Sequence, residues 1–287
     1  MRTAFRTTSA GGLDFDSLPM RLYQKAKRFG TWDPRALDFT RDREDFRSLD
    51  DDAQAAVVQI TALFQAGEEG VTLDLLPLIM VIAEENRLEE ELFLTTFLFE
   101  EGKHVEFFRR YLDEVCEADG DLHRFHTPSY RTLFYEELPE AMGRLRADSS
   151  PEAQIRAAVT YNMIVEGVLA ETGYRSYFLA LERNGLSPGL REGLAHVKRD
   201  ESRHIAYGVH LLSRLIGGDP GRWRVAEERM SELLVPALSF IQESFEPYGP
   251  VSPLGVRLDE LMEFAQSQFS KRLDRIRRGA AHEEVDL

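Results

Sequence analysis

The sequence predicts an all-α protein with a four-helix bundle at its core and additional helices before and after the bundle. Strand-like alternation of polar and apolar residues is rare, and Ala, Leu, Glu and Arg fill long stretches. Two of the helical stretches carry the pattern Glu-x-x-His on an otherwise apolar face. Each pattern follows another inward-facing glutamate at a similar distance, which indicates that one unit of two helices occurs twice.

The composition narrows the class of protein. The chain has 287 residues, 43% of them hydrophobic, which is enough for one sizeable core, and we expect a single domain over 1–287. Its formal net charge of -15 argues against nucleic acid as a partner, because a duplex-binding face needs clustered positive charge. Cys116 is the only cysteine, which excludes a disulfide framework and a metal site built from several thiolates.

The sequence carries no sign of export or of membrane insertion. No hydrophobic region follows the N-terminal residues 1–6, so these residues do not form a secretory signal. The longest apolar run, at about 75–83, is interrupted by Pro77 and is too short to span a bilayer. We therefore expect a cytoplasmic protein without a membrane span.

The bundle is expected over about 50–215. Residues 1–17 lack helical periodicity, and a short helix over 19–28 ends before Gly30. Three aspartates from Asp50 begin a helix that reaches about residue 85 and is weakened at Pro77. Further bundle helices are expected over about 87–117, 130–146, 151–184 and 187–217. Two packing helices should follow over about 220–246 and 254–278, with a mobile tail over 279–287.

The internal repeat defines the candidate site. Glu101 follows Glu68 by 33 residues and Glu201 follows Glu166 by 35, and a histidine lies three residues after each second glutamate. This arrangement is the one used by di-iron and di-manganese carboxylate bundles, in which two helices give one Glu each and two give Glu-x-x-His. The predicted metal ligands are Glu68, Glu101, His104, Glu166, Glu201 and His204.

A single Glu-x-x-His would mean little in a chain with 50 acidic residues and seven histidines. Two of them on apolar faces are more specific, because buried carboxylates must be paired or bind metal. Carboxylates and imidazoles suit manganese and non-haem iron. Glu101 and Glu201 are the natural bridging ligands, since they lie on the two motif helices.

Neighbouring acids compete for these roles. Glu100 adjoins Glu101, but the i,i+3 face favours Glu101 because Glu100 lies about 100° around the helix. Asp200 can hold a ligating histidine through its ring N–H, as outer carboxylates do in metal sites, although a solvated acid fits the spacing equally well. The other histidines are expected to be surface or packing residues: His123, His126, His196, His210 and His282.

These motifs resemble the ferritin-like superfamily and, within it, the small, radical-generating subunit of ribonucleotide reductase. The resemblance is closer to the ligand-binding oxidases that are similar to that subunit. It rests on Gly67-Glu68-Glu69-Gly70-Val71, on Tyr161 five residues before Glu166, and on Asp200-Glu201-Ser202-Arg203-His204. It covers about 50–215 and all six ligand positions.

The resemblance implies a Mn/Fe oxidase in which one ion of each metal is bound, with a di-iron centre as the other possibility. Manganese would lie at Glu68, Glu101 and His104, and iron at the second set of ligands. The resemblance also implies a bound long-chain fatty acid, O2 as co-substrate, an unknown electron donor and a homodimer. Finally, it implies an ether crosslink between Val71 and Tyr161, and a role for Asp200 towards His104.

Sequence geometry alone does not select Tyr161, because five residues before Glu166 is about 140° away on a regular α-helix. A bulge in that helix would bring Tyr161 closer to the face of Glu166. An apolar wall for a lipid-like ligand could come from Leu75, Phe97, Met163 and Ala170, although such residues are more often ordinary core.

Two other functions remain open. A radical-generating reductase subunit is disfavoured because Phe108 stands four residues after His104, where that subunit has its radical tyrosine, and because the last tyrosine is Tyr248. Iron storage of the ferritin kind fits less well, since the chain has helices beyond residue 215 and Glu-x-x-His twice.

Overall fold

The computed structural model describes residues 5–281, and this part of the chain is a helical bundle without a β-sheet. This confirms the all-α prediction. The central helices are α3 (Asp51–Asp74), α5 (Leu88–Glu114), the continuous run from α8 (Pro151–Ala158) to α9 (Glu171–Asn184), and α10 (Pro188–Gly217). They lie side by side: α3 contacts α5, and α10 contacts the segment between α8 and α9.

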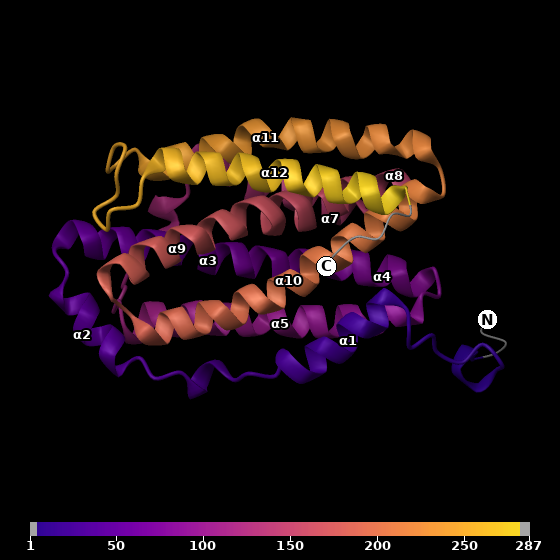
Figure 1. The fold of residues 1–287 in the computed structure, drawn as a ribbon, viewed down its shortest axis with the longest axis horizontal. Helices are drawn as coiled ribbons and strands as arrows, with labels where there is room; N and C mark the ends of the chain where they lie inside the picture. The colour runs from indigo at the N-terminus through magenta and orange to yellow at the C-terminus, as the bar shows by residue number, and fades with distance from the viewer. Residues whose placement is uncertain (1–4, 282–287) are drawn as a thin grey trace.

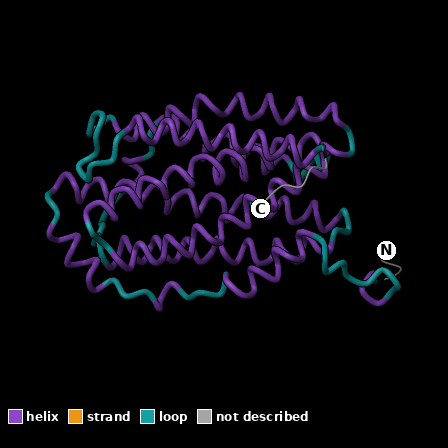
Figure 2. The backbone as a smooth tube through the Cα atoms, viewed as in Figure 1, coloured by secondary structure: helices purple, strands orange, loops and turns teal. Residues whose placement is uncertain are grey.

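Other helices cover two sides of this core. The helices α11 (Trp223–Phe245) and α12 (Leu258–Ala280) lie together along one side, and α1 (Leu18–Phe29) lies on the opposite side (Figure 1). Loops gather at the ends of the bundle, apart from the extended segment that joins α1 to the helix over Thr40–Ser48 (Figure 2). The helix α2 (Thr40–Ser48) was not predicted, because its sequence is mostly charged and has few apolar positions.

The helix predicted over about 50–85 is two helices. Asp50 accepts a hydrogen bond from the Ala53 amide and begins α3, as expected for an N-capping aspartate. The helix α3 ends at Asp74, and α4 (Leu76–Glu84) begins with Pro77 in its first turn. Proline has no N–H to continue the first helix but fits the start of a second one, so it breaks the helix rather than bending it.

The helix predicted over 151–184 is continuous but changes its hydrogen-bonding pattern in the middle. Residues Val159–Ala170 form a π-helix, η5, between α8 and α9. The helix predicted over 130–146 also contains a π-helical part, η4 (Thr132–Glu137), between α6 (Pro128–Arg131) and α7 (Leu138–Arg144). Such π-helical segments are rare and are found mostly at functional sites.

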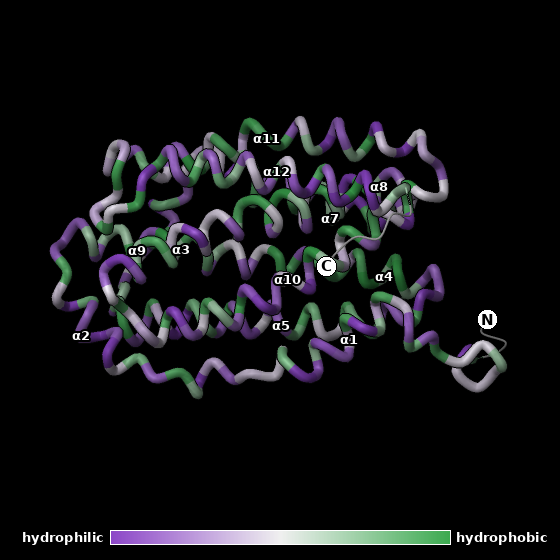
Figure 3. Tube along the Cα trace, viewed as in Figure 1, coloured by the Kyte–Doolittle hydropathy of each residue, from purple (hydrophilic) through white to green (hydrophobic). Residues whose placement is uncertain are grey.

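The C-terminal prediction is partly outside the described residues. The helix α12 reaches Ala280, two residues beyond the expected end, and residues 282–287 of the expected mobile tail are not among those that the structure describes. Within residues 5–281, no helix combines the length and the apolar character needed to cross a membrane. The most continuous hydrophobic stretch in Figure 3 is around α4, whose sequence contains only one charged residue, Glu84.

Candidate metal centre

Four helical segments bring the six predicted ligands to one point in the core. Glu68 comes from α3, Glu101 and His104 from α5, Glu166 from η5, and the second Glu-x-x-His pair from α10. None of the six is more than 6% exposed. Their ligand atoms form two groups, each within 4.8 Å: Glu68, Glu101, His104 and Glu201, and Glu101, Glu166, Glu201 and His204.

Glu101 and Glu201 lie between the two histidines. Glu101 places Oε2 3.6 Å from Nδ1 of His104 and Oε1 3.1 Å from Nδ1 of His204. Glu201 does the same, with Oε1 3.4 Å from His104 and Oε2 3.7 Å from His204. Each carboxylate therefore offers one oxygen to each half of the site, which is the geometry of a bridging ligand.

The outer two glutamates each belong to one half. Glu68 Oε2 lies 3.4 Å from Nδ1 of His104, and Glu166 Oε1 lies 3.7 Å from Nδ1 of His204. The two halves are thus alike in donor set, with one terminal glutamate and one histidine on either side of the shared pair. This donor set fits manganese or iron and offers no thiolate.

Several atoms that face this point have no hydrogen-bond partner in the described part of the chain. Leaving such buried polar atoms unpaired is costly, so a group that binds them is expected here. They are Glu101 Oε2, His104 Nδ1, Glu166 Oε1, Glu201 Oε2 and His204 Nδ1. Two metal ions would satisfy all five, and the residues present therefore fit a dinuclear centre.

The pKa values of the ligand cluster show that its buried carboxylates need positive charge to balance them. Burial raises the pKa of Glu68 to about 8 and holds the pKa of Glu166 well above its usual range. Burial alone would lower the pKa of His104 and His204, but the surrounding carboxylates raise both well above 6.5. Without metal, protons therefore supply the positive charge that balances the buried carboxylates.

Each histidine is held from behind by an acid that precedes the other motif. Nε2 of His104 lies 3.3 Å from Oδ2 of Asp200, and Nε2 of His204 lies 2.9 Å from Oε2 of Glu100. The ring N–H donates to the carboxylate, which leaves Nδ1 of each histidine facing the centre. The contact of Asp200 was among the alternatives considered from the sequence, whereas that of Glu100 was missed.

Glu100 could have been found from the repeat. It occupies the position directly before Glu101 that Asp200 occupies before Glu201, so the two halves share an acidic residue followed by Glu-x-x-His. The place of Glu100 on its own helix does not reveal its contact with His204, because that histidine belongs to another helix. Its partner is on α10, 104 residues away.

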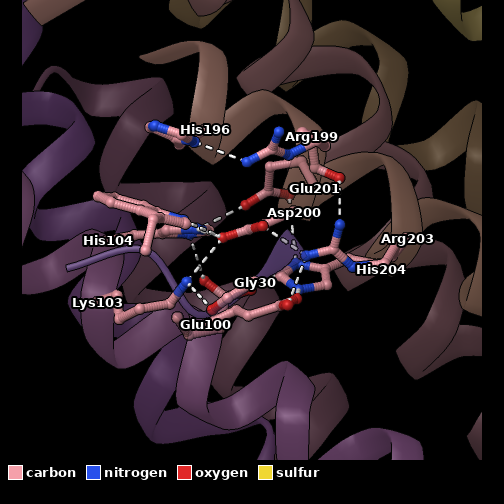
Figure 4. A network of polar contacts seen from close by, with 12 residues as sticks. Gly30, Glu100, Lys103, His104, His196, Arg199, Asp200, Glu201, Arg203 and His204 are labelled. Atoms are coloured by element: carbon pink, nitrogen blue, oxygen red, sulfur yellow. Dashed lines mark hydrogen bonds and ion pairs between the residues drawn. The ribbon is translucent and has the colours of Figure 1, made fainter. Parts of the chain in front are cut away.

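A buried cationic network surrounds these two acids (Figure 4). Arg203 Nη2 donates to Asp200 Oδ1 and to Glu100 Oε1, at 2.5 Å each, and so joins the two halves of the site. Lys103 Nζ donates to Asp200 Oδ2 at 3.0 Å, and Trp32 Nε1 donates to the same oxygen at 2.8 Å. Burial would raise the pKa of Asp200, but His104, Lys103 and Arg203 lower it.

Tyr161 lies against the ligand cluster and the backbone of Val71. Its hydroxyl is 3.2 Å from the Val71 carbonyl oxygen and 3.4 Å from Oε1 of Glu101. The reason is the π-helix: hydrogen bonds in η5 join residues five apart, so Tyr161 and Glu166 share nearly the same face. The helix therefore has an irregularity of the kind that would bring Tyr161 closer to the face of Glu166.

Phe108 is buried in an aromatic stack with no hydroxyl at this position. Its ring centroid lies 5.1 Å from that of Phe64 and 4.9 Å from that of Phe107. The position four residues after His104 is thus filled by apolar packing, which offers no phenol for storing a radical.

A cavity of about 170 Å³ reaches the ligand cluster from the side of α9 and α11. Its inner end is lined by glutamates of the cluster and by Val71, and its walls are almost wholly apolar. Tyr174 also lines it, and the hydroxyl of this residue has no hydrogen-bond partner among the described residues. The cavity extends outward to Tyr248 and Leu254 in the segment between α11 and α12.

The predicted wall is only partly right. Ala170 lines the cavity, but Leu75, Phe97 and Met163 do not. All three are fully buried in the main apolar core instead, and Phe97 stacks on His204 with ring centroids 3.6 Å apart. Helical periodicity identifies inward-facing residues but not which of them meets open space.

The remaining histidines lie in different surroundings, and one of them contacts the network behind His104. His123 is exposed and ion-pairs with Asp121, and His126 packs on Tyr130. His196 stacks on Trp32, with ring centroids 5.1 Å apart, so it touches the network behind His104. His210 lies near Glu90, and His282 is outside the described residues.

The chain is similar to proteins of known type over nearly all of its length. The family model described as ribonucleotide reductase, small chain, matches residues 20–284. A solved R2-like ligand-binding oxidase with aerobically reconstituted Mn/Fe cofactor is 39% identical, with a TM-score of 0.92. The match covers 96% of this chain and 98% of the other.

Two variants of such an oxidase, both with anaerobically reconstituted Mn/Fe cofactor, are similar to the same degree. A glycine-to-leucine variant and a tyrosine-to-phenylalanine variant are each 40% identical, with TM-scores of 0.91 and 0.90. The match covers 96% of this chain and 98% of the other in both cases.

Proposed function

The chain belongs to the ribonucleotide reductase small chain family and, within it, to the R2-like ligand-binding oxidases, and from this premise we propose a mixed-metal, lipid-binding oxidase. The observation that carries the proposal is the ligand cluster, whose unpaired inward atoms border an apolar cavity. The candidate metal site therefore adjoins the cavity in which a substrate-like molecule would bind.

The six residues would hold one manganese and one iron ion. Manganese would bind at Glu68, Glu101 and His104, and iron at Glu166, Glu201 and His204, with Glu101 and Glu201 bridging. When bound, such a pair of metal ions would supply the electrons that reduce O2 and would provide an oxidant able to attack C–H bonds. The protein fixes the ligand geometry, and the outer acids Asp200 and Glu100 keep each histidine ring in place.

The oxidation would also join Val71 to Tyr161. The new bond is an ether between the Tyr161 phenolic oxygen and Cβ of Val71. It requires loss of the phenolic hydrogen and of the single Cβ hydrogen, and the two electrons and two protons pass to O2. The Tyr161 hydroxyl is already at the Val71 backbone and beside Glu101, which supports this assignment.

The ligand would be a long-chain fatty acid or a similar lipid. Its carboxylate would bind at the cluster, where the cavity meets the glutamates, and its tail would follow the apolar walls towards Leu254. The Tyr174 hydroxyl, which has no partner among the described residues, would donate a hydrogen bond to the polar end of the ligand.

A radical-generating reductase subunit is the second candidate, and Phe108 disfavours it. Such a subunit needs a phenol near the metals for its stored radical, and this position is buried and apolar. Tyr161 cannot take that role if it is consumed in an ether bond. Iron storage is weaker still, because an apolar cavity at the metal site has no use in it.

We also propose that the protein is a homodimer. Three apolar side chains near the junction of α3 and α4 are exposed: Leu73 at the end of α3 by 61%, and Leu76 and Met80, one turn apart on α4, by 47% and 59%. Such a group of exposed apolar side chains is typical of a surface that another protein covers. Light scattering after size exclusion would show twice the chain mass, and Leu76→Glu would reduce it to the mass of one chain.

Aerobic metal loading followed by intact-mass and peptide analysis tests the function. The expected result is loss of two hydrogen atoms and a peptide in which Val71 is linked to Tyr161. Tyr161→Phe is the matched control, because it keeps the ring and removes the oxygen. If metal loads and O2 is consumed without a link, the crosslink assignment is wrong while the metal site stands.

A further inference from the structure

The π-helix η5 has to be held in its unusual form. Its twelve residues include Tyr161 and Glu166, whose shared face depends on that form. A π-helical stretch is less favourable than α-helix, so a sequence reverts unless other contacts stabilise it. The contacts made by α11 and α12, which pack against η5, are therefore of interest.

Arg272 on α12 reaches the backbone of η5 from outside. Its Nε donates to the carbonyl oxygen of Gly167 at 3.1 Å, and its Nη2 donates to Oε1 of Gln268 at 3.2 Å. The residue is only 6% exposed, and no carboxylate in the described range lies within 4.0 Å of its guanidinium, although Glu171 and Glu166 act on it from farther away. A buried guanidinium without an acid partner is costly, so its contact with Gly167 must return a benefit.

Gly167 is shaped for this contact. A Cβ at Gly167 would lie 2.8 Å from Nε of Arg272, closer than real Cβ contacts, and 3.1 Å from its Cδ, which is tighter than most. The absence of a side chain therefore lets the guanidinium reach the carbonyl. The residue directly before Gly167 is Glu166, so the contact fixes the backbone next to a predicted metal ligand.

The opposite end of η5 is held differently. Arg229 on α11 donates Nε to the Thr160 hydroxyl at 3.0 Å, and that hydroxyl donates to the Arg156 carbonyl at 2.7 Å. Arg229 is paired with Glu137, at 2.7 Å, and so carries no unpaired charge. Of these two arginines, only Arg272 bonds directly to the backbone of η5.

We propose that Arg272 is a positioning residue that holds η5 in π-helical form through the Gly167 carbonyl, and thereby keeps Tyr161 on the face of Glu166. The expected effect of Arg272 on crosslinking rests on the proposed function. The effect of Arg272 on the form of η5 does not depend on that function. Loss of the contact lets η5 relax towards an α-helix, which turns Tyr161 away from Val71.

Hydrogen exchange on the full chain tests the contact itself. In Arg272→Met, amides of 163–172 should exchange roughly tenfold faster, the effect of losing one charge-assisted hydrogen bond. Arg272→Lys keeps a donor and should restore most of the protection. Arg275→Met is the matched control, because Arg275 lies on the same helix and its side chain makes no hydrogen bond or ion pair with the described residues.

The second readout is the crosslinked fraction after aerobic loading with Mn and Fe. It should fall roughly tenfold in Arg272→Met at equal metal content, because small displacements of reacting atoms cost up to about 100-fold. Gly167→Ala should reproduce both effects with Arg272 intact, and it serves if Arg272→Met does not fold. Rescue by lysine separates positioning from a general loss of stability.

Two results would overturn the proposal: unchanged exchange at 163–172 in both Arg272→Met and Gly167→Ala, or an equal increase in exchange throughout the protein. If the wild-type protein forms no crosslink, the proposed function fails at that step. The exchange measurement still decides the role of Arg272 in that case.

Discussion

Oε2 of Glu100 lies 2.9 Å from Nε2 of His204, although Glu100 belongs to the first Glu-x-x-His helix and His204 to the second. Asp200 makes the converse contact with His104. Each motif therefore supplies ligands to the centre and an outer acid to the other motif's histidine. The two helices depend on each other for the orientation of both imidazoles.

Replacing Glu100 by glutamine should weaken metal binding in the His204 half of the site. The neutral amide is a poorer acceptor for the ring N–H, and loss of such outer partners costs roughly 10- to 100-fold in metal affinity. Metal content after dialysis against a graded chelator measures this. Glu69→Gln is the control, because Glu69 is exposed on α3 next to Glu68. Equal metal retention in both variants would show that Glu100 does not support the site.

Replacing Val71 by alanine should suppress the crosslink without preventing metal binding. The tertiary Cβ hydrogen becomes a primary one in a stronger bond, and an added barrier of about 1.4 kcal/mol slows a step about tenfold. Peptide mass analysis after aerobic loading gives the linked fraction. Val57→Ala, in the same helix and cavity but away from the glutamates, should crosslink like the wild type.

Filling the cavity at Ala170 should exclude the lipid. Phenylalanine at this position overfills the packed wall at a cost of about 1–3 kcal/mol, so bound lipid should fall by roughly tenfold or more. Mass spectrometry of organic extracts from purified protein measures the lipid. Leu75→Met is the comparison, since Leu75 is buried but does not line the cavity. A lipid content that does not respond to Ala170→Phe would place the ligand elsewhere.

Metal binding should strengthen as the pH rises from about 6 to 9. The pKa of Glu68 is raised to about 8, and those of both histidines are raised well above 6.5, so these ligands hold protons at low pH that metal must displace. The raised values also mean that the metal-free protein loses stability as pH rises through them. The increase in Tm on metal addition should therefore be larger at pH 9 than at pH 6. A Tm increase independent of pH would exclude proton displacement.

The sequence was sufficient for the bundle and for the geometry of the six candidate ligands, because both follow from helical periodicity. The i,i+3 spacing places Glu101 beside His104, and the repeat relates them to Glu201 and His204. These features depend on residues within one helix, or on equal spacing in two helices, and need no knowledge of packing.

Features that depend on contacts between helices were less accessible. Glu100 faces away from the ligand stripe of its own helix, and only the packing of α5 on α10 shows its partner. Leu75, Phe97 and Met163 face inward as expected, but open space lies beside Ala170 instead. The π-helix depends on distant residues such as Arg272, so local propensity does not reveal it.

Arg203 gives the site a property that neither half has alone. Because one guanidinium donates to both Asp200 and Glu100, a change of charge at one metal position would alter the field at the other through this shared cation as well as through the shared carboxylates. The loading of two ions would therefore be thermodynamically linked, and by reciprocity each ion would change the affinity of the other by the same factor. A centre that distinguishes two metals would do so as one coupled equilibrium rather than as two independent choices.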